Sequence, residues 1–299
     1  MGTSKGYGGP PSGLVPSWVD DPSPGVRPVP QPAPAPGAPA GPGDGGTPGT
    51  QSAPDGGGAP GAPGLRPVAP DAGGGGYLGG ARGGFSRFAR SGSRSALGGA
   101  LSSYVRHGTG GSRRAARRMG ASRAVGGRLL GVIRDVGRLG LVEVLRRLDL
   151  AGLAGAPAAD VFLAVMEFVC PPGGAVDEAI ARQAMLEAIG DLAEAGVGSF
   201  DALGPAELGE FFLDYVARSI EVRVMADIGG RGVTIPDDAA AVERMQQQLH
   251  DFIVGCTRAE LAGRLDGLGS LTDAQVDGLV NQIYEGAFEL IAVAGEAEA

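Results

Sequence analysis

The sequence has little of the chemistry from which most metal sites and active sites are built. Its 299 residues include two Cys, two His, one Trp and one Lys. Cys170 and Cys256 form neither a disulfide framework nor a metal-ligand pattern, so we interpret them as free buried thiols of a reducing cytoplasm. His107 and His250 have no Cys, Asp or Glu at the spacing of a metal motif such as HExxH.

Nucleotide-binding motifs are missing as well. The chain has no GxxxxGK[ST] and no GxGxxG placed between a strand and a helix. Its Gly-rich runs at 73–76 and 108–111 are expected by chance in a chain that holds 56 glycines. We therefore predict a chain that is not an enzyme and has no catalytic residue, no metal and no cofactor.

Long apolar runs are also lacking. No run reaches the roughly 18 residues that a membrane span needs, and the N-terminus has no apolar h-region of a secretory signal. Met1 and Gly2 begin like a myristoylation motif, but Gly6 stands where that motif needs Ser or Thr. These absences predict a cytoplasmic protein that uses no membrane.

Large apolar residues are scarce in residues 1–76, which hold 18 of the 23 prolines. Such a segment buries too little surface to offset its ordering entropy, so a long disordered Pro/Gly-rich region is predicted. Residues 22–76 form a Pro/Gly/Ala tether with a typical reach of roughly 40–45 Å.

Residues 1–21 differ from the tether behind them. They contain the only Lys, Lys5, and the only Trp, Trp18. An isolated Trp among aliphatic residues in a disordered segment is typical of a docking peptide, because aromatic anchors dominate the affinity of short peptides. The alternative is a chance apolar spot in a linker. The apolar cluster consists of Leu14, Val15, Pro16, Trp18 and Val19.

Charge is divided unevenly along the chain. The net charge is −2 over residues 1–76, +13 over 77–148 and −19 over 149–299. A basic block beside an acidic one indicates either that the two dock on each other or that they have separate partners.

The basic block begins with a segment, residues 77–122, in which Phe85 and Phe88 are interleaved with arginines. Stacking rings plus guanidinium groups are suited to single-stranded nucleic acid, whereas the alternative is a strip that packs its Phe residues on the acidic part of the chain. We expect Ser112 to cap a short helix over 112–119. The arginines that would bind nucleic acid or an acidic partner are Arg87, Arg90, Arg113, Arg114, Arg117, Arg118 and Arg123.

Apolar stripes of helical period run through the remaining chain and predict an all-α fold, a bundle of about six to eight helices. The expected helices span residues 96–107, 112–119, 123–148, 158–170, 177–195, 205–228, 237–262 and a last one capped by Thr272. The predicted domains are a docking peptide (1–21), the tether (22–76), the basic segment (77–122) and an acidic helical domain (123–295).

Several stretches together resemble a known family. MGTSKGYGGP with LVPSWVDD, then ARGGFSRFARSG, GTGGSRRAARRMGASR, FVCPPGGAVDEAIARQAMLEAI and QLHDFIVGC resemble the QatB family. The resemblance implies one of the four components of a bacterial anti-phage defence system, Qat. It implies as partners an ATPase, a QueC-like enzyme and a TatD-like nuclease, and it assigns QatB itself no catalytic role.

The QueC-like partner gives the N-terminus a chemical interpretation. Enzymes of that kind activate the carboxylate of a 7-deazaguanine precursor with ATP and deliver ammonia to it. Removal of Met1 would expose an α-amine on Gly2 with a pKa of roughly 8, which could replace ammonia. We therefore predict a deazaguanine amide on Gly2. The peptide threaded into the partner would include Thr3, Ser4, Gly6, Tyr7, Gly8 and Gly9.

Two alternatives stay open at this point. The tail could serve docking alone, without modification. The chain could instead be a nucleic-acid-binding module of the defence complex that acts through the Arg-rich segment 82–123.

Overall fold

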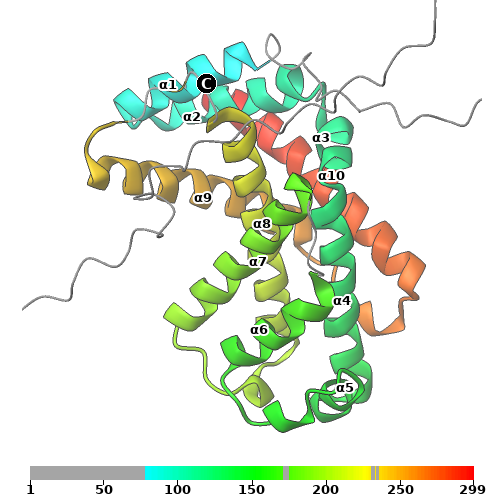
Figure 1. Cartoon of the computed structure of the whole chain (residues 1–299). Helices are drawn as coiled ribbons and strands as arrows, with labels where there is room; N and C mark the ends of the chain where they lie inside the picture. The colour runs from blue at the N-terminus through cyan, green and yellow to red at the C-terminus, as the bar shows by residue number, and fades with distance from the viewer. Residues whose placement is uncertain (1–77, 171–174, 230–232, 234–235) are drawn as a thin grey trace, which may run out of the picture. The chain divides into compact units, whose positions relative to one another are not determined.

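The computed structural model describes residues 78–170, 175–229, 233 and 236–299. Within these ranges the chain forms ten α-helices and no strand, which confirms the predicted all-α class (Figure 1). None of the described helices is both long and apolar enough to cross a membrane. The region predicted to be disordered, residues 1–76, lies outside the described residues.

The helices follow one another with short connections. The first five are α1 (Gly79–Ser91), α2 (Arg94–Ser103), α3 (Ser112–Arg118), α4 (Gly120–Leu139) and α5 (Leu141–Arg147). The other five are α6 (Ala158–Val169), α7 (Val176–Glu194), α8 (Pro205–Gly229), α9 (Ala239–Leu261) and α10 (Asp273–Glu298). A π-helical turn, η1 (Tyr104–Gly108), follows α2, and 3-10 turns lie at η2 (Ala151–Leu153), η3 (Phe200–Ala202) and η4 (Leu268–Ser270).

The number of helices exceeds the expected six to eight for two reasons. The helix predicted over 123–148 is interrupted at Gly140, whose φ of 81° a helix does not accommodate. Residues 79–91, for which no helix was predicted, form α1 and end at Gly92 with a left-handed φ of 62°. The boundary predicted between residues 122 and 123 falls inside α4.

Helix starts follow local capping chemistry in part. Thr272 caps α10 as predicted, since its side chain accepts a hydrogen bond from the backbone N–H of Gln275 while Gln275 reaches back to Thr272. Ser112 is not the N-cap of α3: Gly111 holds that position with a φ of 105°, so Ser112 is the first helical residue. The sequence does not reveal this because the cap geometry depends on the π-helical turn before it.

The core is built around α8 and α10 (Figure 1). Helix α8 packs on α4, α7 and α9, and buries residues on every side, as a helix enclosed by others must. Two of its buried hydroxyl groups are hydrogen-bonded to neighbouring helices: the Tyr215 hydroxyl donates to the carbonyl of Ser122 at 2.9 Å, and Ser219 shares a 2.7 Å hydrogen bond with Tyr284 of α10.

The basic N-terminal helices pack on the same core. Helix α2 lies against α1 and α10, and Phe85 and Phe88 of α1 are buried. The crossing of α2 and α10 is close, because a Cβ atom on Gly295 would lie 2.4 Å from the carbonyl oxygen of Gly98. The rings that were candidates for base stacking therefore belong to the protein interior.

Candidate functional site

The predicted docking peptide and modification site lie outside the described residues. This applies to Gly2, Thr3, Ser4, Gly6, Tyr7, Gly8, Gly9, Leu14, Val15, Pro16, Trp18 and Val19. What the structure does describe is the basic segment behind the tether, and the surfaces of the helical body that the segment joins.

Three of the candidate arginines contact acidic or polar side chains of the same chain. Arg113 pairs with Glu285 of α10 at 2.6 Å, and Arg118 pairs with Asp227 of α8 at 3.3 Å. Arg123 donates to the side-chain oxygen of Asn281 at 2.7 Å. Since Asn281 and Glu285 are one turn apart, the contacts of Arg123 and Arg113 lie along one face of α10.

Arg114 and Arg117 also lie on α3, but they are exposed and form no ion pair with any described residue. In sequence they stand between Arg113 and Arg118, which pair with Glu285 of α10 and Asp227 of α8. Of the four arginines that the sequence predicts on α3, two therefore form no ion pair with a described residue.

Asp227 makes several of the contacts between the basic helices and the rest of the helical body, and sequence reasoning did not identify it. Its carboxylate accepts from the Tyr104 hydroxyl at 2.9 Å and pairs with Arg118 and Arg223, both at 3.3 Å. Its backbone carbonyl accepts from Arg82 at 3.3 Å. Burial, and next the Asp227 charge, raise the pKa of Tyr104 far above its usual value, so the phenol stays a proton donor.

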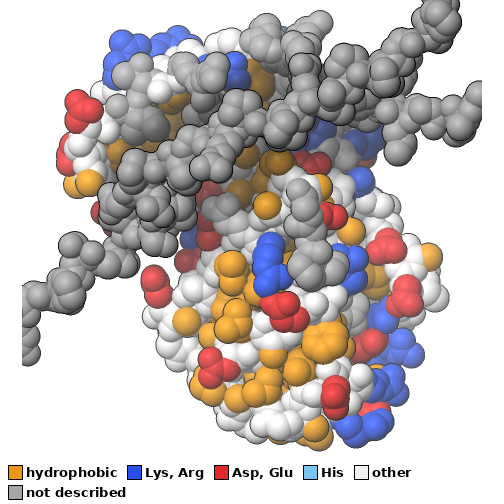
Figure 2. Space-filling model, in the orientation of Figure 1, with side chains coloured by type: hydrophobic (Ala, Val, Ile, Leu, Met, Phe, Trp, Pro, Cys, Tyr) orange, Lys and Arg blue, Asp and Glu red, His pale blue; other side chains and the backbone are white. Residues whose placement is uncertain are grey.

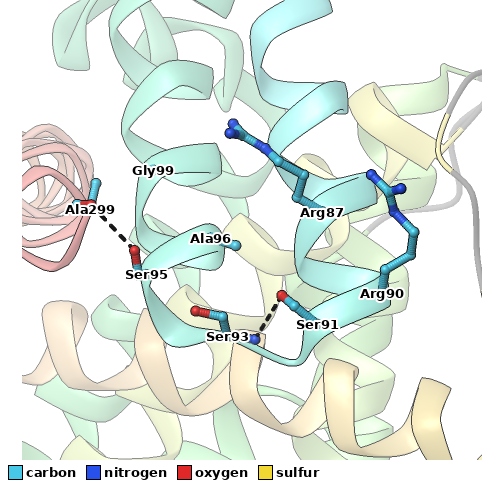
Figure 3. A pocket seen from close by; sticks show the side chains of 8 residues that line it. All are labelled: Arg87, Arg90, Ser91, Ser93, Ser95, Ala96, Gly99 and Ala299. Carbon is cyan, nitrogen blue, oxygen red and sulfur yellow. Dashed lines mark hydrogen bonds between the residues drawn. The ribbon is translucent and has the colours of Figure 1, made fainter.

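Arg87 and Arg90 lie apart from the α3 arginines. They extend from the last two turns of α1 and line a hollow of about 570 Å³ at the turn into α2, where Ser91, Ser93 and Ser95 also lie (Figure 3). Helix α2, ten residues and therefore about 15 Å long, leads from this hollow to η1 and α3. The structure thus divides the candidate arginines into two groups.

The described lining of the hollow at α1 and α2 contains two arginines and three serines, together with Ala299 and no Asp or Glu side chain. Ser91 accepts a hydrogen bond from the Ser93 backbone N–H, and Ser95 donates to the carbonyl of Ala299 (Figure 3). Its chemistry suits a small anion or an acidic side chain.

A second group of titratable residues lies between α7, α8 and α9. Asp191, Asp214 and His250 line a hollow of about 460 Å³ there. The Arg218 guanidinium donates a hydrogen bond to the Asp191 carboxylate at 2.8 Å and another to the Glu221 carboxylate. The Glu221 carboxylate is also hydrogen-bonded to Nδ1 of His250 at 3.0 Å. His250 therefore has a carboxylate partner, supplied by α8 and not by a neighbour in sequence.

Burial and the nearby Asp191 carboxylate raise the pKa of Asp214 to about 6. The raised pKa means that the folded state binds a proton that the unfolded chain releases, so stability falls as pH rises from about 4 to 7. We expect Asp214→Asn to remove this loss and to stabilise the protein by roughly 1–2 kcal/mol at pH 7.5, with little effect at pH 4. Urea unfolding of both proteins at the two pH values measures this change in stability. An equal change at pH 7.5 and pH 4 would contradict the raised pKa of Asp214 as its cause.

The two cysteines are free and buried, as predicted. Burial raises the pKa of both Cys170 and Cys256 to about 11, which keeps them protonated and unreactive at neutral pH. Among the residues with described side chains, no three His, Cys, Asp or Glu side chains are grouped so that they could hold a metal ion.

Comparison with known proteins identifies the family. Residues 110–291, from the turn before α3 to the last turns of α10, match the family described as Qat anti-phage system associated protein QatB. The chain belongs to the QatB family. Neither a curated protein nor a solved structure matches it.

The QatB match covers the acidic helical body and the α3 arginines, and it leaves out α1, α2 and residues 1–77. Membership makes the chain a component of the Qat anti-phage defence system. It also implies that other components of that system are its partners.

Proposed function

We propose that this chain is a non-catalytic adaptor of the Qat system, whose N-terminal peptide docks into a QueC-like enzyme and is modified there on Gly2. Membership in the QatB family is the observation that carries the proposal. The composition of residues 1–21, with the only Trp and the only Lys ahead of a Pro-rich tether, supports the docking role. The adaptor acts in the cytoplasm, and its further partners are the ATPase and the TatD-like nuclease of the system.

The proposed modification is an acyl transfer. After Met1 is removed, the neutral α-amine of Gly2 attacks the activated carboxyl carbon of the deazaguanine precursor. A C–N bond forms, the bond from that carbon to the ATP-derived group breaks, and the amine loses a proton. The product is an amide on an unhindered glycine, and Thr3 to Gly9 occupy the enzyme's channel.

The contacts of the basic segment favour this adaptor over a nucleic-acid-binding module. Arg113 and Arg118 pair with carboxylates of α10 and α8, and Arg123 donates to Asn281. Phe85 and Phe88 are buried. The segment thus uses both rings and part of its charge in contacts with the helical body of its own chain.

Salt-dependent binding of single-stranded DNA separates the two functions. If α3 offers only Arg114 and Arg117 to phosphates, the slope of log K against log salt should be about −1.4. Use of all five arginines from Arg113 to Arg123 predicts about −3.5. Fluorescence anisotropy between 50 and 200 mM salt measures the slope. A slope near −3.5 that falls to about −2.1 when Arg113→Ala is combined with Arg118→Ala would establish the nucleic-acid module instead.

The proposal itself is tested by the intact mass of the chain produced with and without the QueC-like enzyme. Added mass that maps to Gly2 supports it, and an unchanged mass contradicts the modification.

A further inference from the structure

Exposed apolar side chains are concentrated on two adjacent helices. Seven large apolar side chains of the described residues are exposed, and four of them, Leu163, Phe168, Val176 and Leu186, lie on α6 and α7. In Figure 2 hydrophobic side chains gather on the face to which these helices belong, with charged side chains of both signs among them. Elsewhere on the described body such residues occur in ones and twos, which is normal for a protein surface.

Helical spacing about one ion pair places Leu163 and Leu186 on the same side of α6 and α7. Helices α6 and α7 pack together, and Arg182 of α7 pairs with Glu167 of α6 at 2.5 Å. Leu163 precedes Glu167 by four residues and Leu186 follows Arg182 by four, so in this antiparallel pair both lie one turn from the ion pair in the same direction. They are 47% and 46% exposed. We call Leu163, Glu167, Arg182 and Leu186 the α6–α7 face.

The opposite side of α6 is fixed in the core, so the α6–α7 face has a defined orientation. Phe162 stacks on Phe211 of α8 with ring centres 3.8 Å apart and meets Phe200 edge-on at 5.0 Å. Rotation of α6 to hide Leu163 would break these ring contacts. Leu163 is therefore exposed because the ring contacts of Phe162 hold α6 in this orientation.

Charge decides what kind of molecule can cover this surface. Helices α6 and α7 hold seven acidic residues, of which Glu167, Asp177 and Asp191 pair with arginines of the chain. The other four, Asp160, Glu178, Glu187 and Glu194, form no ion pair with a described residue. A second copy that docked the same helices would bring four such carboxylates against four. The N-terminal residues 1–76, with three basic and five acidic groups, also lack the complementary charge. A basic partner is the occupant that electrostatics favours.

We propose that the α6–α7 face is a docking surface for a basic amphipathic helix of another protein component of the defence complex. The helices are 12 and 19 residues long, so the face extends for about 18–28 Å. A partner helix of four or five turns would cover it, placing apolar residues on Leu163 and Leu186 and its Lys or Arg residues among the carboxylates. This site is separate from the N-terminal peptide.

The test compares full-length chains co-produced with the other components of the system, with the retained components quantified by size-exclusion chromatography and light scattering. Leu163→Glu combined with Leu186→Glu should weaken the retention of one component at least tenfold. Val142→Glu, on an equally open surface of α5 where Val142 is 64% exposed, should change nothing.

A second variant tests the charge without touching the leucines. Glu187→Lys with Glu194→Lys should lower the same retention several-fold, and raising salt to 0.5 M should do so in the unmodified chain. Retention of every component by both variants at the level of the unmodified chain would overturn the proposal. Conversion of a dimer to a monomer by the leucine variant, with no component lost, would also overturn it and assign the face to a second copy.

The intact mass of the chain in the same samples keeps this test distinct from that of the proposed function. The surface variants should leave the modification of Gly2 unchanged, whereas loss of the modification with full retention of components bears only on the tail.

Discussion

A chain shortened to begin at Tyr77 is expected to lose all detectable binding to the purified QueC-like enzyme. The shortened chain keeps every described helix but lacks the predicted docking residues, among them the aromatic anchor Trp18. Because a few buried aromatic contacts dominate peptide affinity, removal of the whole peptide should weaken binding by a factor of about 100 or more. Isothermal titration of the full and shortened chains measures it.

Two variants separate the peptide from its tether. Trp18→Ala in the full chain should weaken binding roughly tenfold or more. Replacement of residues 22–76 by a Gly/Ser linker of equal length should preserve it, because the tether supplies only reach. Unchanged binding by the chain that begins at Tyr77 would show that the helical body, and not the peptide, holds the enzyme.

Replacing Asp227 by alanine is expected to loosen the attachment of the basic helices to the body. The carboxylate is 12% exposed, accepts a hydrogen bond from Tyr104 and forms ion pairs with Arg118 and Arg223. The Arg223 side chain is itself 11% exposed. Removing one member of a buried ionic network leaves its partners desolvated, so we expect a loss of roughly 2–4 kcal/mol. Arg223 retains Asp177 as a partner, which keeps the loss below the upper end of the usual range.

Urea unfolding of the full chain measures this loss, and α8 offers a matched control. Glu210 pairs with Arg258 on an open surface where both side chains are 56% exposed, so Glu210→Ala should cost less than about 1 kcal/mol. Hydrogen exchange should show the extra opening of Asp227→Ala in α1 to α3 first. Equal effects of the two substitutions would contradict the role assigned to Asp227.

The all-α class and most helix positions could be predicted because long apolar stripes of period 3.6 are strong signals. Helix α1 was missed because its sequence, GGARGGFSRFARS, is rich in glycine and has weak intrinsic helix propensity. The burial of Phe85 and Phe88 overrides that propensity, and burial by distant helices is not visible in the local sequence. The break at Gly140 was missed because a glycine inside an apolar stripe is often tolerated.

The candidate site could be predicted only in outline. The opposite charges of residues 77–148 and 149–299 allowed either internal docking or separate partners, and the pattern alone did not choose. The choice depends on contacts such as that of Tyr104 with Asp227, which are 123 residues apart. Asp214 was not singled out, since its raised pKa comes from burial and from Asp191 on another helix.

The central claim is that the N-terminal amine is the acceptor of a group supplied by the QueC-like enzyme. The most direct measurement is the intact mass of the full chain co-produced with that enzyme, followed by fragmentation of its N-terminal peptide. The account predicts that Met1 is lost and that the chain gains the mass of the deazaguanine carboxylic acid less one water. This gain in mass should be located on Gly2, and it should be absent when the enzyme is omitted or its ATP site is disabled. An unmodified mass, or a gain that persists when the N-terminal amine is blocked, would contradict it.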